Sequence, residues 1–129
     1  MNTFHINVTV APEHLDDLNH VNNVQYLEWV QQVSKAHWQK LSLPEWDMHY
    51  IWVVHSHLIR YHQPAFLGEE LVISTFIKAA KGAKSERHVH ITRKGMEPPL
   101  VTCETIWVLL DAKSGKPVRV PAEMISALE

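Results

Sequence analysis

The chain has 129 residues, of which 46% are hydrophobic and 20% are charged, and its formal net charge is −2. This composition is typical of one globular domain with its own core, so we expect a single domain over residues 1–129. The near-neutral charge argues against a nucleic-acid-binding surface, and no apolar run reaches the roughly 20 residues of a membrane span.

The sequence has one cysteine, Cys103, which excludes an internal disulfide framework and favours a reducing compartment. Residues 1–5 lack the basic start and the apolar run of a signal peptide. We therefore expect a cytoplasmic protein that binds neither nucleic acid nor membranes.

Residues Phe4–Val10 alternate between apolar and polar side chains, which predicts a half-buried strand. After a polar loop, a stretch without Pro or Gly predicts one long helix that is capped by Asn22 or Asn23 and ends at Leu41. Its apolar side chains do not fit one narrow stripe. We therefore expect other parts of the chain to cover much of its circumference.

A loop is expected at Glu45–Met48, and four further strands follow from runs of β-branched and aromatic residues between short turns. The predicted strands are Tyr50–Tyr61, Glu70–Ala80, Lys84–Lys94 and Leu100–Asp111, with turns at 64–68, 81–83, 95–99 and 113–117 and a terminal helix at Pro121–Leu128. We expect the four strands to form an antiparallel meander, with the first strand at an edge or inserted between them. The fold class is α+β, with a five-stranded antiparallel sheet curled around one long central helix in the order β-α-β-β-β-β.

The strand Leu100–Asp111 is apolar on both faces toward its end. One face can pack on the helix, and the other would be exposed in a monomer. We therefore expect a homo-oligomer, either a homodimer or a homotetramer built on a twofold dimer.

Three segments resemble the hotdog-fold thioesterases, in the 4-hydroxybenzoyl-CoA thioesterase-like branch and in the plant acyl-ACP thioesterases. Asp16, the run His20–Asn23 and Tyr26 are similar to the Asp-x-x-x-His-Val-Asn-Asn signature followed by Tyr. Tyr61–Leu71 resembles the Tyr-x-x-Pro-x-x-x-Gly-Asp-x-Leu segment, and Trp107–Pro117 resembles the C-terminal strand and turn. The resemblance implies a hotdog fold, a dimer or tetramer, and the hydrolysis of a thioester.

Three positions depart from that pattern. Asn19 stands where many members have Gly, but Asn can also adopt a left-handed conformation, so the turn can be kept. Leu18 replaces an Asn of the plant acyl-ACP thioesterases, and His14 replaces a more frequent Asp. A mechanism that needs the Asn replaced by Leu18 is not implied here.

The resemblance places Asp16 in the catalytic position, as either the nucleophile or the general base for water. The nearby helix N-terminus should favour its ionised form. His20 either orients this carboxylate or polarises the substrate, although a loop histidine bonded to the backbone is an equal alternative. Free N–H groups of the first helical turn, around residues 22–24, would stabilise the oxyanion.

Further candidates line the substrate path or bind the phosphates of CoA. The predicted substrate-binding residues are Asn22, Asn23, Val24, Tyr26 and His62, and the predicted phosphate contacts are Lys81, Lys84 and Arg87. Two histidine pairs, His55/His57 and His88/His90, each have the spacing of two ligands on one strand face, but no further metal signature accompanies them. We expect neither a metal nor an organic cofactor.

The sequence therefore predicts an acyl-CoA thioesterase that releases a free acid and CoA. One alternative is an acyl-ACP thioesterase, which acts on a thioester of a carrier protein. The other, of a different class, is a non-catalytic hotdog domain that binds acyl-CoA.

Overall fold

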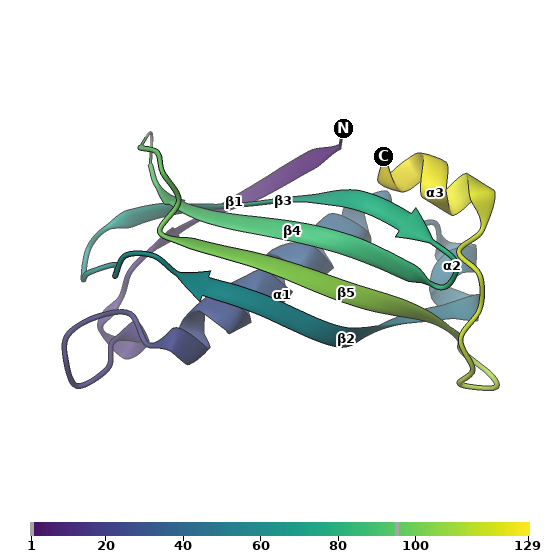
Figure 1. Cartoon of the computed structure of the whole chain (residues 1–129), viewed down its shortest axis with the longest axis horizontal. Helices are drawn as coiled ribbons and strands as arrows, with labels where there is room; N and C mark the ends of the chain where they lie inside the picture. Colours follow the sequence, from purple (N-terminus) through teal and green to yellow (C-terminus); the bar gives the residue numbers. More distant parts are fainter. Residues whose placement is uncertain (1, 95) are drawn as a thin grey trace.

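The computed structural model describes residues 2–94 and 96–129 and has an α+β fold, in which five strands form one antiparallel sheet (Figure 1). The elements are β1 Thr3–Thr9, the 3₁₀ turn η1 Pro12–His14, α1 Asn23–Leu41, α2 Pro44–His49, β2 Tyr50–Tyr61, β3 Glu70–Lys81, β4 Lys84–Arg93, β5 Val101–Asp111 and α3 Ala122–Leu128. Each predicted strand and the long helix are present, with ends within one residue of the prediction. Within the predicted turn at 95–99, Gly95 lies outside the described residues.

The sheet has the strand order β1-β3-β4-β5-β2. The predicted meander of four consecutive strands is wrong at β2, which pairs with β5 along its length rather than with β3. Residues 62–69 therefore carry the chain from one edge of the sheet to β3, next to the opposite edge. β1 takes that opposite edge, one of the two predicted positions.

Helix α1 crosses one face of the sheet diagonally (Figure 1). Its buried side chains recur at helical spacing and form one stripe, consisting of Tyr26, Trp29, Val30, Val33, Ser34 and His37. The opposite side of the helix, which includes Gln31, Gln32 and Lys35, is exposed. The expectation that the chain covers much of the circumference of this helix is therefore wrong.

The predicted loop Glu45–Met48 is also wrong, because these residues belong to α2. Pro44 occupies the first turn of this short helix, where its missing N–H costs nothing. The acidic side chains in that turn stabilise the helix by interacting with the positive end of its dipole. The buried Trp46 anchors the helix to the core.

Among the strands, β2 rather than β5 carries the large exposed apolar side chains. β5 lies inside the sheet, and Ile106, Trp107 and Val108 are half-buried there. The exposed apolar residues of β2 are Ile51, Val53, Leu58 and Tyr61. None of the described helices combines the length and apolar character needed to span a membrane.

His37 joins α1 to β1 and β4 in the interior. Its side chain is 1% exposed, its Nδ1 accepts a 2.9 Å hydrogen bond from Arg87 Nη1, and its ring stacks on Phe4. Burial, and secondly the positive charges of Arg87 and Lys40, lower the pKa of His37 to about 4. The folded protein therefore holds this imidazole in its neutral form well below pH 6.5.

We expect the free energy of unfolding to fall as the pH decreases from about 6.5 toward 4. In this window the unfolded chain binds a proton at His37 that the folded chain does not, so stability rises with pH. Thermal unfolding at about pH 7 and about pH 5 should show a smaller pH-dependent loss of Tm in His37→Gln than in the wild type. The exposed His5→Gln serves as the control, and an equal pH dependence in His37→Gln and wild type would contradict the assignment.

Candidate active site

A tight turn before α1 positions the acidic residue singled out by the sequence. The Asp16 N–H donates to the His20 carbonyl over 2.8 Å, and the Asn19 N–H donates to the Asp16 carbonyl over 3.0 Å. Asn19 has a φ of +62°, the left-handed conformation that Asn tolerates better than most residues. The expectation that Asn19 keeps this turn in place of Gly is confirmed.

The Asp16 carboxylate is half-buried and held by the backbone of its own turn. Its Oδ1 accepts hydrogen bonds from the N–H groups of Leu18, at 2.9 Å, and His20, at 3.2 Å. Among the described residues, no donor bonds the other oxygen, Oδ2. One oxygen thus fixes the carboxylate, and the other is available to a reactant.

The first turn of α1 leaves one N–H group for a ligand. The Asn22 N–H donates to the His14 carbonyl over 2.8 Å, and Asn22 Oδ1 caps the Val24 N–H over 2.9 Å. The prediction of free N–H groups is therefore wrong for Asn22 and Val24. The Asn23 N–H has no acceptor within the described residues, and Asn23 lines the pocket described next.

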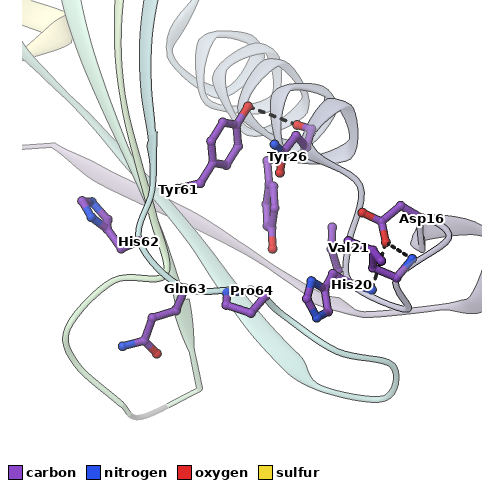
Figure 2. Close-up of a pocket in the computed structure, with 10 residues that line it drawn as sticks. Asp16, His20, Val21, Tyr26, Tyr61, His62, Gln63 and Pro64 are labelled. Carbon is purple, nitrogen blue, oxygen red and sulfur yellow. Dashed lines mark hydrogen bonds between the residues drawn. The ribbon is translucent and has the colours of Figure 1, made fainter.

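A pocket of about 350 Å³ lies between the Asp16 turn, the start of α1 and the segment that follows β2 (Figure 2). It is lined by Asp16, Leu18, His20, Val21, Asn23, Tyr26, Tyr61, His62, Gln63 and Pro64. Five of the predicted site residues therefore meet here, namely Asp16, His20, Asn23, Tyr26 and His62. Asn22 and Val24 do not line the pocket.

Three lining residues that were not predicted come from the end of β2 and the following segment. Tyr61 and Pro64 occupy fixed positions in the Tyr-x-x-Pro pattern, so the resemblance already contained a signal for both. Gln63 fills a variable position of that pattern, and no sequence signal marks it.

Tyr26 forms the floor of the site and ties α1 to the segment after β2. Its side chain is 2% exposed, and its hydroxyl oxygen accepts a hydrogen bond from the Ala65 N–H over 3.1 Å. Burial raises the pKa of Tyr26, so the phenol is neutral at physiological pH. Tyr61 is exposed and reaches the same helix by a longer bond of 3.4 Å from its hydroxyl to the Asn23 carbonyl.

The two candidate histidines lie on different sides of the pocket (Figure 2). His20 contacts Asp16 through its backbone N–H, whereas its ring packs edge-on against Phe66 with ring centres 5.2 Å apart. His62 Nε2 lies 3.0 Å from the Thr102 hydroxyl. The orienting role predicted for His20 is thus filled by its main chain.

An ion pair braces the segment opposite Asp16. Arg93 pairs with Glu69 and also donates from Nη2 to the Pro64 carbonyl over 3.0 Å, and Glu69 Oε1 accepts from the Phe66 N–H over 2.8 Å. Burial acts to raise the pKa of Glu69, but the hydrogen bonds from Arg93 and Phe66 outweigh it and lower the pKa. Segment 64–69 is therefore fixed from the sheet side.

The predicted phosphate contacts do not lie at this pocket. Lys81 and Lys84 are opposite each other in the strand register next to the turn of the β3–β4 hairpin. This hairpin lies at the far end of the sheet from the Asp16 turn (Figure 1). The prediction that Arg87 contacts a phosphate is wrong. Its side chain points into the interior, where it donates to His37 and Thr75 and is 4% exposed. A guanidinium group in this position does not bind a phosphate at the protein surface.

The histidine pair on β2, His55 and His57, does not share one strand face as predicted. A β-bulge between Val54 and Ser56 shifts the alternation, so His55 is exposed while His57 is half-buried and bonds the Thr105 hydroxyl over 2.8 Å. His88 and His90 share one face of β4 and both contact Phe76. Within residues 2–94 and 96–129, no group of three or more His, Cys, Asp or Glu side chains has the arrangement of a metal site.

We expect Tyr26→Phe to destabilise the protein, because it removes the acceptor of the buried Ala65 N–H. A buried donor left without a partner costs about 1–3 kcal/mol. Chemical denaturation should show this loss in Tyr26→Phe and a change below about 0.5 kcal/mol in Tyr61→Phe, whose hydroxyl makes the longer, exposed bond. Equal stability of both variants and the wild type would contradict the role of Tyr26.

Known structures include close matches to this fold. YbaW, a probable thioesterase from Escherichia coli, matches with a TM-score of 0.80 and 27% identity over 98% of this chain and 96% of that chain. A variant of 4-hydroxybenzoyl-CoA thioesterase in complex with 4-hydroxybenzoyl-CoA matches with a TM-score of 0.86 and 17% identity over 98% and 99% of the two chains. A 1,4-dihydroxy-2-naphthoyl-CoA thioesterase from Synechocystis matches with a TM-score of 0.84 and 18% identity over 98% and 96%.

The matches to the 4-hydroxybenzoyl-CoA and 1,4-dihydroxy-2-naphthoyl-CoA thioesterases show a shared fold. A comparison with curated proteins gives no match. The family model of the acyl-ACP thioesterase N-terminal domain matches residues 1–128, nearly the whole chain. The predicted resemblance to the hotdog-fold thioesterases is therefore confirmed. The chain belongs to the family of the acyl-ACP thioesterase N-terminal domain.

Proposed function

We propose that this protein is an acyl-CoA thioesterase that hydrolyses an acyl thioester to a free acid and CoA. The observation that carries the proposal is the arrangement of Asp16 and Asn23 in one pocket. Asp16 is held by two N–H groups at one oxygen. Within the described residues, its other oxygen and the Asn23 N–H at the start of α1 have no hydrogen-bond partner. These are the two elements that thioester hydrolysis requires, an activated attacking group and an oxyanion donor.

Asp16 supplies the attack in one of two ways. As a general base, it takes a proton from water while the water oxygen bonds to the thioester carbon. As a nucleophile, its free oxygen bonds to that carbon, and water later cleaves the anhydride that forms. In both routes the carbonyl oxygen gains negative charge, which the Asn23 N–H stabilises together with the positive end of α1. The C–S bond then breaks, and the thiolate leaves and takes up a proton.

The thiol carrier defines the second candidate function. The family match favours a carrier-protein thioester, because the matching family is that of the acyl-ACP thioesterases. The same pocket chemistry serves both carriers, since the reacting carbonyl is attached to the same phosphopantetheine arm. Rates on one acyl chain carried by CoA and by a carrier protein distinguish the two.

Assembly completes the proposal. We infer a homodimer formed through β2, with α1 as the central helix of each hotdog fold. β2 is an edge strand of 12 residues whose outer edge has no partner in the described part of this chain, and it carries exposed apolar side chains at Ile51, Val53 and Leu58. Exposed, long and apolar edges readily pair with another strand. Two such dimers stacked on each other would give the tetramer.

A twofold axis through the middle of β2 would place its Tyr61 end beside the Tyr50 end of the partner strand. The pocket at Asp16, which includes Tyr61, would then open at the interface. The proposed location is the cytoplasm, supported by the single, buried Cys103.

We expect Asp16→Asn to reduce thiol release from acyl-CoA by at least about 100-fold, because the amide can neither attack nor accept the proton. The test measures thiol release over a panel of acyl-CoAs from short to long and from aliphatic to aromatic. Asp17→Asn is the matched control, since Asp17 is an exposed neighbour that does not line the pocket.

Full activity of Asp16→Asn would refute the catalytic assignment. Wild-type activity on the carrier-protein substrate alone would favour the acyl-ACP thioesterase. Thermal stabilisation of the wild type by acyl-CoA without any thiol release would identify the non-catalytic binding domain.

We expect Val53→Lys to dissociate the dimer, because it places a charge on the edge that pairs. Sedimentation at micromolar concentration should show dimers or tetramers of the wild type and a shift toward monomers of Val53→Lys. Leu43→Lys, which charges an exposed apolar position outside the sheet, should sediment like the wild type. A monomeric wild type would overturn the proposed assembly.

A further inference from the structure

The loop between β1 and α1, residues 10–22, carries Asp16 and is fixed at both of its ends. Backbone hydrogen bonds tie it to segment 65–69 on the opposite side of the pocket, twice at Val10, over 2.9 Å each, and once at Val21, over 3.0 Å. Between these two anchors, the position of the Asp16 carboxylate depends on contacts that the loop makes with itself and with α1.

His14 makes most of these contacts. Its imidazole Nδ1 accepts a 2.9 Å hydrogen bond from the Ala11 N–H, and its own N–H donates to the Ala11 carbonyl over 3.0 Å. Its carbonyl accepts from the Asn22 N–H over 2.8 Å. Its ring packs edge-on against Trp29, with ring centres 5.1 Å apart. A residue two positions before Asp16 thus links the end of β1, the helix cap and the body of α1.

The His14 ring supplies an acceptor that the backbone does not replace. Among the described residues, Nδ1 is the one acceptor of the Ala11 N–H. A backbone N–H can only donate, so Nδ1 is the unprotonated nitrogen of the ring. A partly buried N–H without an acceptor costs free energy, and the loop would rearrange to give it another partner. We therefore expect the loop to keep its conformation only while residue 14 offers an acceptor.

His14 stands where the thioesterase motif more often has Asp. Asp, Asn and His share one property, because each places an acceptor atom two bonds beyond Cβ. An Asp at this position could accept the same hydrogen bond from the Ala11 N–H. The imidazole keeps that acceptor and adds a ring that packs against Trp29.

The main chain of His14 also determines which N–H group is left for the substrate. Its carbonyl occupies the Asn22 N–H, whereas the Asn23 N–H has no acceptor within the described residues. The chain between His14 and Asn22 carries Asp16. The geometry of this closure therefore sets the distance between the attacking carboxylate and the oxyanion donor, and a misplacement of about 1 Å can cost a large factor in rate.

We propose that His14 is a positioning residue for thioester hydrolysis, an inference that rests on the proposed function. Through its Nδ1 acceptor, it holds the loop in the conformation that presents Asp16 and the Asn23 N–H to the same carbonyl group. His14 contacts neither the substrate nor the reacting atoms. Loss of the acceptor therefore lowers kcat, whereas KM changes little.

Two substitutions separate the acceptor from the ring. His14→Asn keeps an acceptor, Oδ1, at the position of Nδ1 and removes the ring from Trp29, whereas His14→Phe keeps a ring and removes the acceptor. We expect kcat for thiol release from acyl-CoA to fall at least about tenfold in His14→Phe and to stay within about threefold of the wild type in His14→Asn. KM should stay within about threefold in both variants. His5→Phe, the same change at an exposed position of β1, is the matched control.

A role limited to packing against Trp29 predicts the opposite order, with His14→Phe more active than His14→Asn. Wild-type kcat in a folded His14→Phe variant would overturn the proposal. An equal loss of kcat in His14→Asn and His14→Phe would also overturn it, because the acceptor would then not be the property that matters.

Hydrogen exchange of the full-length protein tests the positioning without any substrate. Peptides that cover residues 15–22 should exchange faster in His14→Phe than in the wild type and at the wild-type rate in His14→Asn. Peptides of the β3–β4 hairpin, residues 78–87, should exchange alike in all three proteins. Wild-type exchange of residues 15–22 in His14→Phe would overturn the proposal. If that variant does not fold, His14→Leu, which lacks both acceptor and ring, replaces it under the same criterion.

Asp16→Asn separates this inference from the proposed function. Full activity of Asp16→Asn would refute the catalytic assignment alone, because the exchange result for the His14 variants does not depend on it. An inactive Asp16→Asn together with wild-type exchange and wild-type kcat in His14→Phe would overturn the positioning role alone.

Discussion

The site depends on the backbone N–H and carbonyl groups of Ala65, which both form hydrogen bonds to residues at or near the start of α1. Its carbonyl accepts from the Val21 N–H at 3.0 Å, and its N–H donates to the Tyr26 hydroxyl at 3.1 Å. One bond fixes the residue before the helix cap, and the other fixes the first turn of the helix. The Asp16 turn and the segment after β2 are therefore held at a set separation, and the pocket lies between them.

The local features of this site could be predicted from sequence because they depend on neighbouring residues. The cap at Asn22, the left-handed Asn19 and the end of the helix at Leu41 each follow from the side chains at or next to those positions. The resemblance added Asp16 and its pocket partners, since the motif preserves their spacing. The ends of the strands were predictable for the same reason.

The remaining features depend on contacts between distant parts of the chain. The pairing of β2 with β5 follows from the packing of the whole sheet, and runs of β-branched residues do not encode partners. The bulge at His55 reversed the face of one histidine, which simple alternation cannot foresee. Arginine is usually exposed at the protein surface, and only the three-dimensional structure shows that the Arg87 side chain points at His37 and Thr75.

The strand order also has a consequence for synthesis on the ribosome. β2 precedes β3, β4 and β5 in the chain, yet its neighbour in the sheet is β5. Until residues 101–111 have left the exit tunnel, β2 has no strand to pair with. Tyr61 at its end and His62 just after it, which both line the pocket, then lack a fixed frame. Asp16 and the helix cap can form early from local contacts, but the opposite wall of the pocket forms late. The complete pocket is therefore among the last features that the nascent chain acquires.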